Sequence, residues 1–346
     1  MKSFVKMSKY AGMREDLVQA GGGNSAVKLE AGKMVIKASG YQLADVTENE
    51  GYAIVDPRVI RDSFLNCEDI DLMTEKGSKD ILKKAYIEGK KPSIETFLHS
   101  ISGKYSLHTH PTVVNVLACR KDGEQILEEL FKDSLIVPYA TPGVELAKTY
   151  FKYYKNYKEI HKTEPKVVFL LNHGLLVSAE SAEEVIQLTE TVTKKIETYL
   201  EMDYSSYHYM MDILELYHGE GIIWKVNDYN VIKVYKNLGG LWKHYFCPDC
   251  VVFLGKEFYE IKEKKIKKDK FQEFVAHNGE PVIIAYENLL YIHAESVKKA
   301  LEIQSVLSFS AQVMFLNKQQ ECNLLSESEK DFLLDWDAEK YRKNIK

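Results

Sequence analysis

Apolar and polar positions follow two different periods along this chain. Short apolar runs bounded by small or turn-forming residues predict strands, and longer stretches with apolar positions three and four residues apart predict amphipathic helices. Because the two interleave and hairpins are frequent, we expect an α/β (α+β) fold with a central, mainly antiparallel sheet flanked by helices. The predicted strands cover 26–29, 34–37, 52–56, 106–110 and 167–171, and the predicted helices cover 3–20, 112–119, 144–157 and 182–201.

A further helix is expected to begin near Ser93, because a serine at the N-cap accepts hydrogen bonds from the first helical turn. Glu95 then falls in that first turn. His99 follows four residues later, so the two side chains share one face of the predicted helix. We interpret His99 as a core residue or a neighbour of the site.

A polar, tyrosine-rich tract at Asp203–His208 is the predicted boundary between two domains. A chain of 346 residues is long enough for one large or two ordinary domains. We therefore expect a first domain over 1–204 and a second α/β domain over 205–346.

The second predicted domain contains a segment whose sequence pattern resembles that of a segment in the first. Val167–Glu184 and Pro281–Lys299 both show an apolar strand, a Leu-Leu pair, an Ala-Glu-Ser turn and an amphipathic helix. Where the first copy has His173–Gly174, the second has Glu287–Asn288. The hypothesis is a decayed duplication, in which 205–346 is a half without metal ligands. Chance similarity between two strand–turn–helix units is the alternative.

Composition and charge narrow the class of protein. Hydrophobic residues make up 45% of the chain and charged residues 28%, as in an ordinary globular protein, and the net charge of −5 favours neither nucleic acid nor a membrane surface as partner. The N-terminus lacks the apolar core of a secretory signal, and no run approaches the roughly 18 apolar residues of a membrane span. We expect a cytoplasmic protein.

The five cysteines are scattered, which also favours a reducing compartment. Cys247 and Cys250 form a Cys-x-x-Cys motif, but a zinc ribbon requires a second pair. From the sequence alone we interpret them as ordinary free thiols.

Three histidines and one glutamate carry the candidate chemistry. In an extended strand, side chains two residues apart point to the same face, so His108 and His110 present two imidazoles to one ion. His173 follows the apolar run 167–171, and Glu95 supplies a carboxylate. Three nitrogen ligands leave coordination positions open, which is typical of catalytic rather than structural zinc. Taken alone, His-x-His also arises by chance, and most histidines have no ligand role.

Two segments of small residues predict an anion-binding surface. Gly21–Ser25 and Ala38–Gly40 bound a predicted hairpin and offer backbone N–H groups and hydroxyls. Glycine permits close approach of the backbone, and successive N–H groups form an anion nest. Lys28 and Lys37 lie in the hairpin; they either add positive potential or are solvated strand lysines.

The order of these motifs resembles the class II aldolase/adducin family, over about residues 12–202. The stretches 21–28 and 93–111 are most similar to the aldolase portion of bifunctional rhamnulose-1-phosphate aldolase/dehydrogenases, without the dehydrogenase domain. The motifs are Gly21–Ser25, Lys37–Gly40, Pro92–Glu95, His108–Pro111, Pro138–Gly143 and Asn172–Gly174.

The resemblance implies a class II aldolase-like three-layer α/β/α fold and a role for each matching residue. It implies that His108, His110 and His173 bind a divalent metal, zinc in the first place and manganese or cobalt as alternatives. Glu95 is then the general acid/base, and Tyr139 reaches into a neighbouring subunit's site. The residues expected to hold the substrate and its phosphate are Gly22, Gly23, Asn24, Lys37, Ser39, Gly40 and Ser93.

The function implied is a metal-dependent lyase that cleaves a ketose phosphate, of the rhamnulose or fuculose 1-phosphate type, to dihydroxyacetone phosphate and an aldehyde. Such cleavage passes through an enediolate, whose charge a divalent cation stabilises. One departure is Ile94, which stands where the family often has a second hydroxyl residue. The alternatives are a sugar-phosphate 4-epimerase, dehydratase or decarboxylase and, outside enzymes, an adducin-like scaffold. We expect a homo-oligomer, a dimer or a tetramer.

Overall fold

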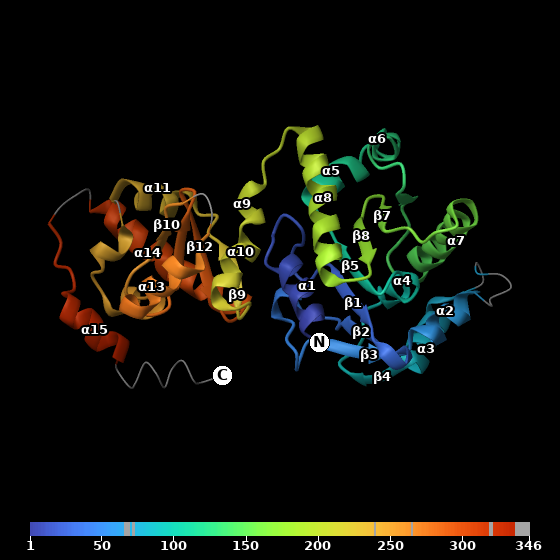
Figure 1. The fold of residues 1–346 in the computed structure, drawn as a ribbon, viewed down its shortest axis with the longest axis horizontal. Coiled ribbons are helices and arrows are strands. Elements are labelled where there is room, and N and C mark those ends of the chain that lie inside the picture. The colour runs from blue at the N-terminus through green and yellow to red at the C-terminus, as the bar shows by residue number, and fades with distance from the viewer. Residues whose placement is uncertain (66–69, 71–72, 239, 264–265, 318–320, 336–346) are drawn as a thin grey trace. The chain divides into compact units, whose positions relative to one another are not determined.

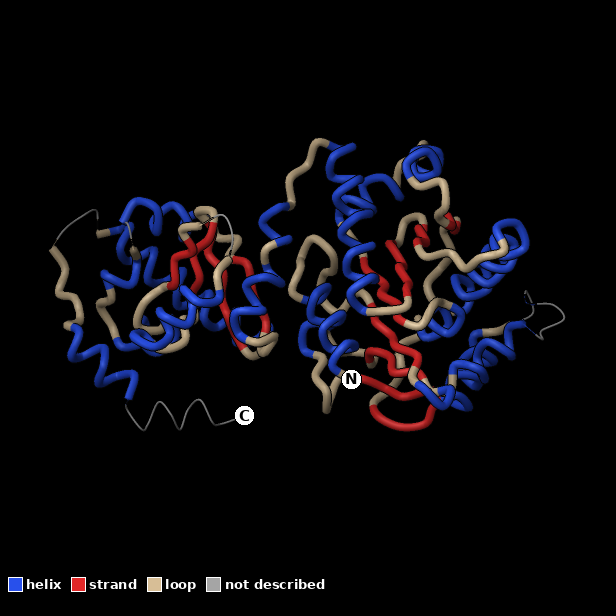
Figure 2. Tube along the Cα trace, in the orientation of Figure 1, coloured by secondary structure: helices blue, strands red, loops and turns tan. Residues whose placement is uncertain are grey.

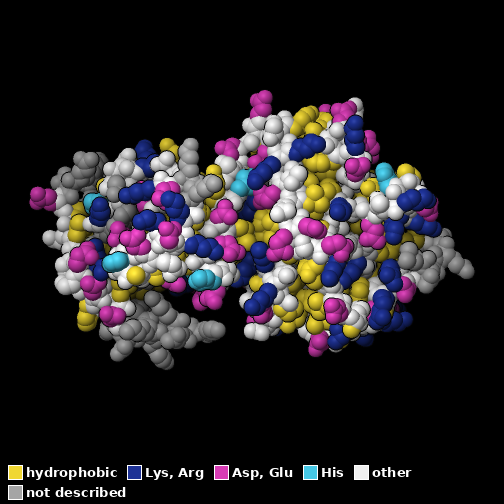
Figure 3. Space-filling view, in the orientation of Figure 1, with side chains coloured by type: hydrophobic (Ala, Val, Ile, Leu, Met, Phe, Trp, Pro, Cys, Tyr) yellow, Lys and Arg dark blue, Asp and Glu magenta, His cyan; other side chains and the backbone are white. Residues whose placement is uncertain are grey.

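A computed structural model describes the chain except for residues 66–69, 71–72, 239, 264–265, 318–320 and 336–346 (Figure 1). The chain divides into two compact units, Met1–Tyr204 and Ser205–Lys346. In the described residues, no helix is both long and apolar enough to cross a membrane. Lysines, arginines and acidic residues are interspersed on the face of each unit seen in Figure 3.

The first unit is built on one eight-stranded sheet of order β4-β3-β2-β1-β5-β8-β7-β6. Every pairing is antiparallel except that of β6 with β7. The predicted α/β fold with a mainly antiparallel sheet is therefore confirmed. The strands are β1 (Asn24–Lys28), β2 (Met34–Lys37), β3 (Tyr52–Val55), β4 (Tyr86–Gly89), β5 (Tyr105–Thr109), β6 (Leu135–Val137), β7 (Val167–Leu170) and β8 (Gly174–Ala179).

Helices cover the sheet in two groups (Figures 1 and 2). The helices α1, α5 and α8 pack together with strands β1, β5 and β8. On the other side, α2, α4 and α7 enclose an apolar core with side chains of β2 and β3, in which Phe64 stacks on Phe151 with ring centroids 4.4 Å apart. The helices are α1 (Lys2–Gly12), α2 (Pro57–Leu65), α3 (Glu75–Ala85), α4 (Thr96–Ile101), α5 (Thr112–Ala118), α6 (Gly123–Leu130), α7 (Val144–His161) and α8 (Ala182–Leu200).

The first helix is shorter than predicted. A helix over 3–20 was expected, but α1 ends at Gly12. A Cβ atom on Gly12 would lie 2.0 Å from the backbone nitrogen of Ala44, so the helix end packs directly on the short 3₁₀ turn η2 (Leu43–Asp45). The chain then leaves the helix and forms the loop that leads to β1.

Two further boundaries differ from the sequence-based expectation. The helix expected to begin near Ser93 begins at Thr96, because Ser93 and Glu95 form a turn before it, in which the Ser93 Oγ accepts the Glu95 backbone N–H at 3.3 Å. The strand β5 ends at Thr109, so His110 lies just past its end. His173 lies in the turn between β7 and β8.

The second unit contains a four-stranded sheet of order β10-β11-β12-β9. Its α14 carries a long buried face against β12 and β9. The elements are α9 (Ser205–His208), α10 (Met210–Leu214), η4 (Glu215–Tyr217), β9 (Ile222–Lys225), α11 (Tyr229–Leu238), η5 (Leu241–His244), α12 (Pro248–Leu254), β10 (Tyr259–Ile261), α13 (Lys268–Asn278), β11 (Ile283–Tyr286), β12 (Leu289–Ala294), α14 (Val297–Leu316) and α15 (Glu327–Asp335).

The two sheets share one strand connectivity, and the duplication stays a hypothesis. In the first unit the chain runs β5, helices, β6, α7, β7, β8, α8; in the second it runs β9, helices, β10, α13, β11, β12, α14. In both, the second and third strands pair in parallel, and the third–fourth and fourth–first pairs are antiparallel. Ser181 and Ser296 cap the corresponding helices α8 and α14.

The strand pairing corrects one detail of the proposed correspondence. Leu170 pairs with Gly174, which leaves a three-residue turn, whereas Tyr286 pairs with Leu289 and leaves two residues. When the two copies are aligned backward from the N-cap serines Ser181 and Ser296, His173 corresponds to Asn288 and not to Glu287. An asparagine stands where the first unit has its histidine.

Replacement of Gly12 by alanine should destabilise the first unit. The added methyl group meets backbone atoms that cannot rotate away, and overpacking of this kind costs about 1–3 kcal/mol. Gly21→Ala is the matched control, because a Cβ there has no atom within 4 Å. Urea unfolding followed by circular dichroism measures both free energies. Equal stability of the two variants would contradict the tight packing of α1 on η2.

Candidate metal centre

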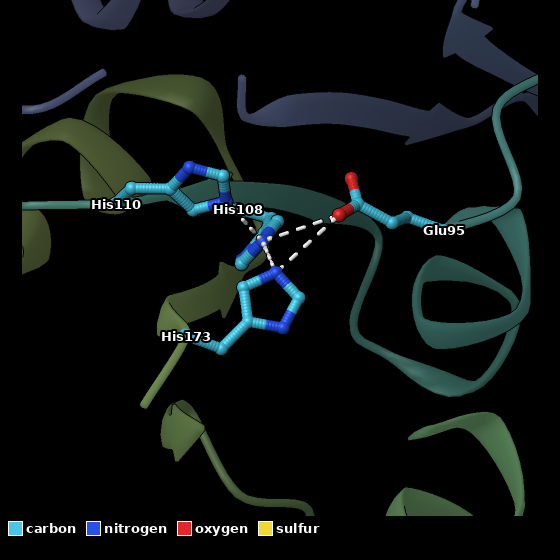
Figure 4. A group of neighbouring side chains, drawn as sticks. All are labelled: Glu95, His108, His110 and His173. Atoms are coloured by element: carbon cyan, nitrogen blue, oxygen red, sulfur yellow. Dashed lines mark hydrogen bonds and ion pairs between the residues drawn. The ribbon is translucent and has the colours of Figure 1, made fainter. Parts of the chain in front are cut away.

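Three imidazoles and one carboxylate converge in the first unit (Figure 4). One ligand atom from each of Glu95, His108, His110 and His173 lies within 4.8 Å of the others. The Nε2 atom of His108 is 3.1 Å from that of His110 and 3.2 Å from that of His173. The Glu95 Oε1 atom is 3.5 Å from Nε2 of His108 and 3.6 Å from Nε2 of His173.

These distances fit a bound divalent cation. Zinc–nitrogen bonds of about 2.0–2.1 Å in a tetrahedral site place neighbouring nitrogens roughly 3.3 Å apart. The nitrogen separations of 3.1 and 3.2 Å are close to that value. Each neutral imidazole offers one nitrogen lone pair, and three of these turned toward one point provide a cation with three ligands. The donor set of three nitrogens and one carboxylate oxygen suits zinc and other first-row divalent metals.

Backbone contacts hold His108 and His110 in place. The Nδ1 atom of His108 lies 3.0 Å from the carbonyl oxygen of Leu175 on the neighbouring strand β8. A hydrogen bond donated there leaves Nε2 with a free lone pair toward the centre, as in most histidine metal ligands. The His110 backbone N–H donates to the Leu17 carbonyl at 2.8 Å, which ties the end of β5 to the loop after α1.

The electrostatics favour neutral imidazole and ionised carboxylate. Burial, together with the neighbouring His108 and His173, lowers the pKa of His110 to about 3. For Glu95, burial raises the pKa, but the interactions with His108 and His173 outweigh it and hold the pKa well below its usual range. Both groups are therefore in the protonation states that bind a cation.

The glycine-rich loop lies directly against the histidines. A Cβ on Gly22 would lie 2.9 Å from Nδ1 of His110, and Gly23 has a φ of +73° and would bring a Cβ to 2.9 Å from the carbonyl oxygen of His108. Asn24 pairs with His108 across β1 and β5. Its side chain is buried, and its Oδ1 atom has no hydrogen-bond partner within the described chain.

Lys37 binds backbone carbonyls. Its buried ammonium donates to the carbonyl of Gly21 at 3.2 Å and to that of Tyr41 at 2.6 Å. Burial lowers its pKa, and the nearby Glu95 opposes that change. Lys37 thus links the loop that precedes Asn24 to the turn that contains Ser39 and Gly40.

The predicted hydroxyl residues Ser39 and Ser93 line the same cavity. An isolated antiparallel bridge joins Ala38 to Pro92, and the Ser39 N–H donates to the Lys91 carbonyl at 2.9 Å. These contacts pair the segment after β2 with the segment that leads to Glu95. Gly40 has a φ of +84° and open space around it. Whether these residues bind phosphate stays a prediction.

Two residues of interest from the sequence lie outside the histidine cluster. Tyr139 is 59% exposed on the segment between β6 and α7. His99 is fully buried, and its Nδ1 contacts the Ser106 hydroxyl at 2.6 Å. Burial lowers the pKa of His99 to about 3, so it is a neutral core histidine.

Sequence reasoning missed a buried ion cluster that supports the centre. The guanidinium of Arg14 is 1% exposed; it donates to both Asp16 carboxylate oxygens, at 3.1 and 2.6 Å, and also to Glu190 on α8. The Asp16 carbonyl accepts the Thr112 N–H at 2.8 Å, next to the contact between Leu17 and His110. The only sequence feature that marks this cluster is an Arg-x-Asp triplet in a predicted helix. Such triplets are too common to predict a buried ion cluster.

Comparison with known proteins identifies the family of this chain. Residues 2–200, more than half of the chain, match the family described as "Class II Aldolase and Adducin N-terminal domain". The chain therefore belongs to the class II aldolase/adducin family.

One curated relative is the "Uncharacterized oxidoreductase YuxG" of Bacillus subtilis (strain 168). It is 28% identical over 218 residues, and the match covers 58% of this chain but only 29% of that protein. The chain thus spans less than a third of the relative's length.

Solved structures with a similar fold include the N-terminal class II aldolase domain of a conserved protein from Thermoplasma acidophilum. It is 24% identical, with 57% of this chain and 92% of that chain covered and a TM-score of 0.49. The L-fuculose-1-phosphate aldolase of Thermus thermophilus is 19% identical, with coverages of 60% and 94% and a TM-score of 0.38.

Removal of one imidazole should abolish metal retention. In His110→Ala we expect affinity for zinc to fall at least about 100-fold, because even groups that only support a ligand contribute about 10–100-fold. Elemental analysis after dialysis measures the bound metal, and His277→Ala, an exposed histidine of the second unit, is the control. Normal metal content in His110→Ala would rule out this centre.

Replacement of Arg14 by methionine should destabilise the protein by about 3–5 kcal/mol, because it leaves the buried Asp16 carboxylate without its partner. Arg58→Met is the matched control, since Arg58 also pairs with an aspartate, Asp56, but at the surface. We expect little change in the control. Urea unfolding measures the free energy of unfolding of both variants. Equal losses would show that the buried ion cluster stabilises the protein no more than the surface ion pair does.

Proposed function

We propose that this protein is a metal-dependent, class II aldolase-like lyase that acts on a ketose phosphate. It would cleave the substrate reversibly to dihydroxyacetone phosphate and an aldehyde. The observation that carries the proposal is the convergence of three histidine Nε2 atoms with the Glu95 carboxylate. Membership of the family supports it. When bound, a divalent ion would supply Lewis acidity that stabilises negative charge on substrate oxygens.

Glu95 is the proposed general acid/base. Its side chain is 17% exposed and ionised, and its carboxylate lies at the edge of the histidine cluster, within reach of a substrate there. A carboxylate in that state accepts a substrate hydroxyl proton and returns it to carbon or oxygen. The turn formed with Ser93 fixes the backbone that carries it.

The neighbouring surface suits an anionic group. A cavity of about 680 Å³ opens beside Ser39 and Ser93. Ile94, which replaces the family's second hydroxyl, lines it together with four lysines and one glutamate. Lys79 and Lys90 form ion pairs with Glu75 and Glu50, so we infer that Lys83 and Lys91 supply the positive charge that attracts a phosphate dianion in place of the missing hydroxyl. The lysines are Lys79, Lys83, Lys90 and Lys91.

The exposed Tyr139 supports a homo-oligomer with shared sites, as the family resemblance implies, because an aromatic ring that is 59% exposed has no role in its own core. The complete ligand set argues against a scaffold without activity, because the buried His108 and the half-buried His110 and His173 converge with a carboxylate at one place. A cytoplasmic location remains part of this proposal.

A coupled assay for dihydroxyacetone phosphate tests the proposed reaction. The zinc-loaded protein should release it from at least one member of a panel of ketose 1-phosphates, rhamnulose and fuculose 1-phosphate included. Mass spectrometry and NMR of the same mixtures detect epimerised, dehydrated or decarboxylated products. Any of these without dihydroxyacetone phosphate would contradict the lyase assignment and favour another reaction of the family.

Glu95→Gln should keep its metal and lose turnover by about 10²–10⁴-fold, because the amide cannot transfer the proton. Glu88→Gln is the matched control, since Glu88 lies exposed on the edge strand β4. Metal content and rate are measured on the same preparations. Full activity of Glu95→Gln would remove the residue from the mechanism.

A further inference from the structure

The second unit contains a pair of thiols in contact. Cys247 and Cys250 flank the start of α12, and their Sγ atoms are 3.4 Å apart. A disulfide requires about 2.05 Å between the sulfurs, so the two must approach by roughly 1.4 Å to form the bond. Cys247 precedes the helix with extended backbone (φ −145°, ψ 159°), and Cys250 lies in its first turn.

The two thiols differ in accessibility. Cys247 is half-buried, and the intervening Pro248 and Asp249 are exposed. Cys250 is completely buried, between the helix and its packing partners. Burial raises the pKa of the Cys250 thiol to about 11, so it is the less reactive of the two toward solutes. An external oxidant therefore meets Cys247 first, and Cys250 is placed to react with it afterwards.

We propose that Cys247 and Cys250 form a redox-active dithiol that closes to an intramolecular disulfide by exchange with a small-molecule disulfide and reopens with excess thiol. This inference does not depend on the proposed lyase function. It also goes beyond the sequence-based interpretation of the two residues as ordinary free thiols, because spacing alone does not place the sulfurs in contact.

The exchange balances in two steps. The Cys247 thiol loses its proton to solvent, and its sulfur attacks one sulfur of oxidised glutathione, whose disulfide bond breaks. The departing glutathione sulfur takes up a proton, and a mixed disulfide remains on Cys247. The Cys250 sulfur then loses its proton and attacks the Cys247 sulfur, so that a second glutathione thiol leaves. Two protein thiols are oxidised and one glutathione disulfide is reduced to two thiols.

Mass spectrometry of the full-length protein after incubation with oxidised glutathione tests the proposal. We expect the peptide with Cys247 and Cys250 to lose two hydrogen atoms and to regain them with dithiothreitol. In Cys250→Ala we expect glutathione to stay attached to Cys247, because the resolving thiol is missing. In Cys247→Ser the buried Cys250 should stay unmodified. Cys119, which is exposed, is the internal control and should carry only a mixed disulfide.

Two outcomes would overturn the proposal. In one, wild-type Cys247 accumulates glutathione as Cys119 does, and no internal disulfide forms. In the other, Cys250 reacts with glutathione at the same rate in Cys247→Ser as Cys119 does, which would show that the pair has no division of roles. Circular dichroism of each variant establishes that it is folded before the comparison, and Cys250→Ser replaces Cys250→Ala if the latter unfolds.

Discussion

The structure of the first unit depends on one electrostatic constraint, the approach of three imidazole nitrogens and a carboxylate oxygen to a common point. Burial, together with the neighbouring His108 and His173, lowers the pKa of His110 to about 3, so its ring is neutral at neutral pH. A divalent cation bound between the four groups would accept their lone pairs and compensate the negative charge of Glu95. Metal binding and folding of this region are therefore expected to be coupled.

Much of the surrounding architecture serves to hold these four groups. The pairing of β5 with β1 places Asn24 beside His108, and the pairing of β5 with β8 supplies the carbonyl that orients the His108 ring. Lys37 joins the two loops that face the cluster. Arg14 and its carboxylates fix the segment whose backbone holds His110. The second unit repeats the strand connectivity and has Asn288 at the position that corresponds to His173.

The candidate ligands could be predicted from the sequence because their chemistry is local. Two histidines two residues apart on a strand share a face, and a histidine after a buried apolar run lies at the end of a strand. The antiparallel sheet followed from short apolar runs and turns. The end of α1 could not be predicted, because it depends on contact between Gly12 and Ala44. The partners of Lys37, which are backbone carbonyls, and the Arg14 partner Glu190, which lies 176 positions away, could not be predicted either.

X-ray absorption spectroscopy of the zinc-loaded protein tests the central claim most directly, because it reports the atoms around the ion without reference to activity. Nitrogen or oxygen neighbours at about 2.0–2.1 Å, with the multiple scattering of imidazole rings, are the expected result. The signal should lose imidazole scattering in His173→Ala. Sulfur neighbours at about 2.3 Å would place the metal on cysteines such as Cys247 and Cys250 and would contradict the histidine centre.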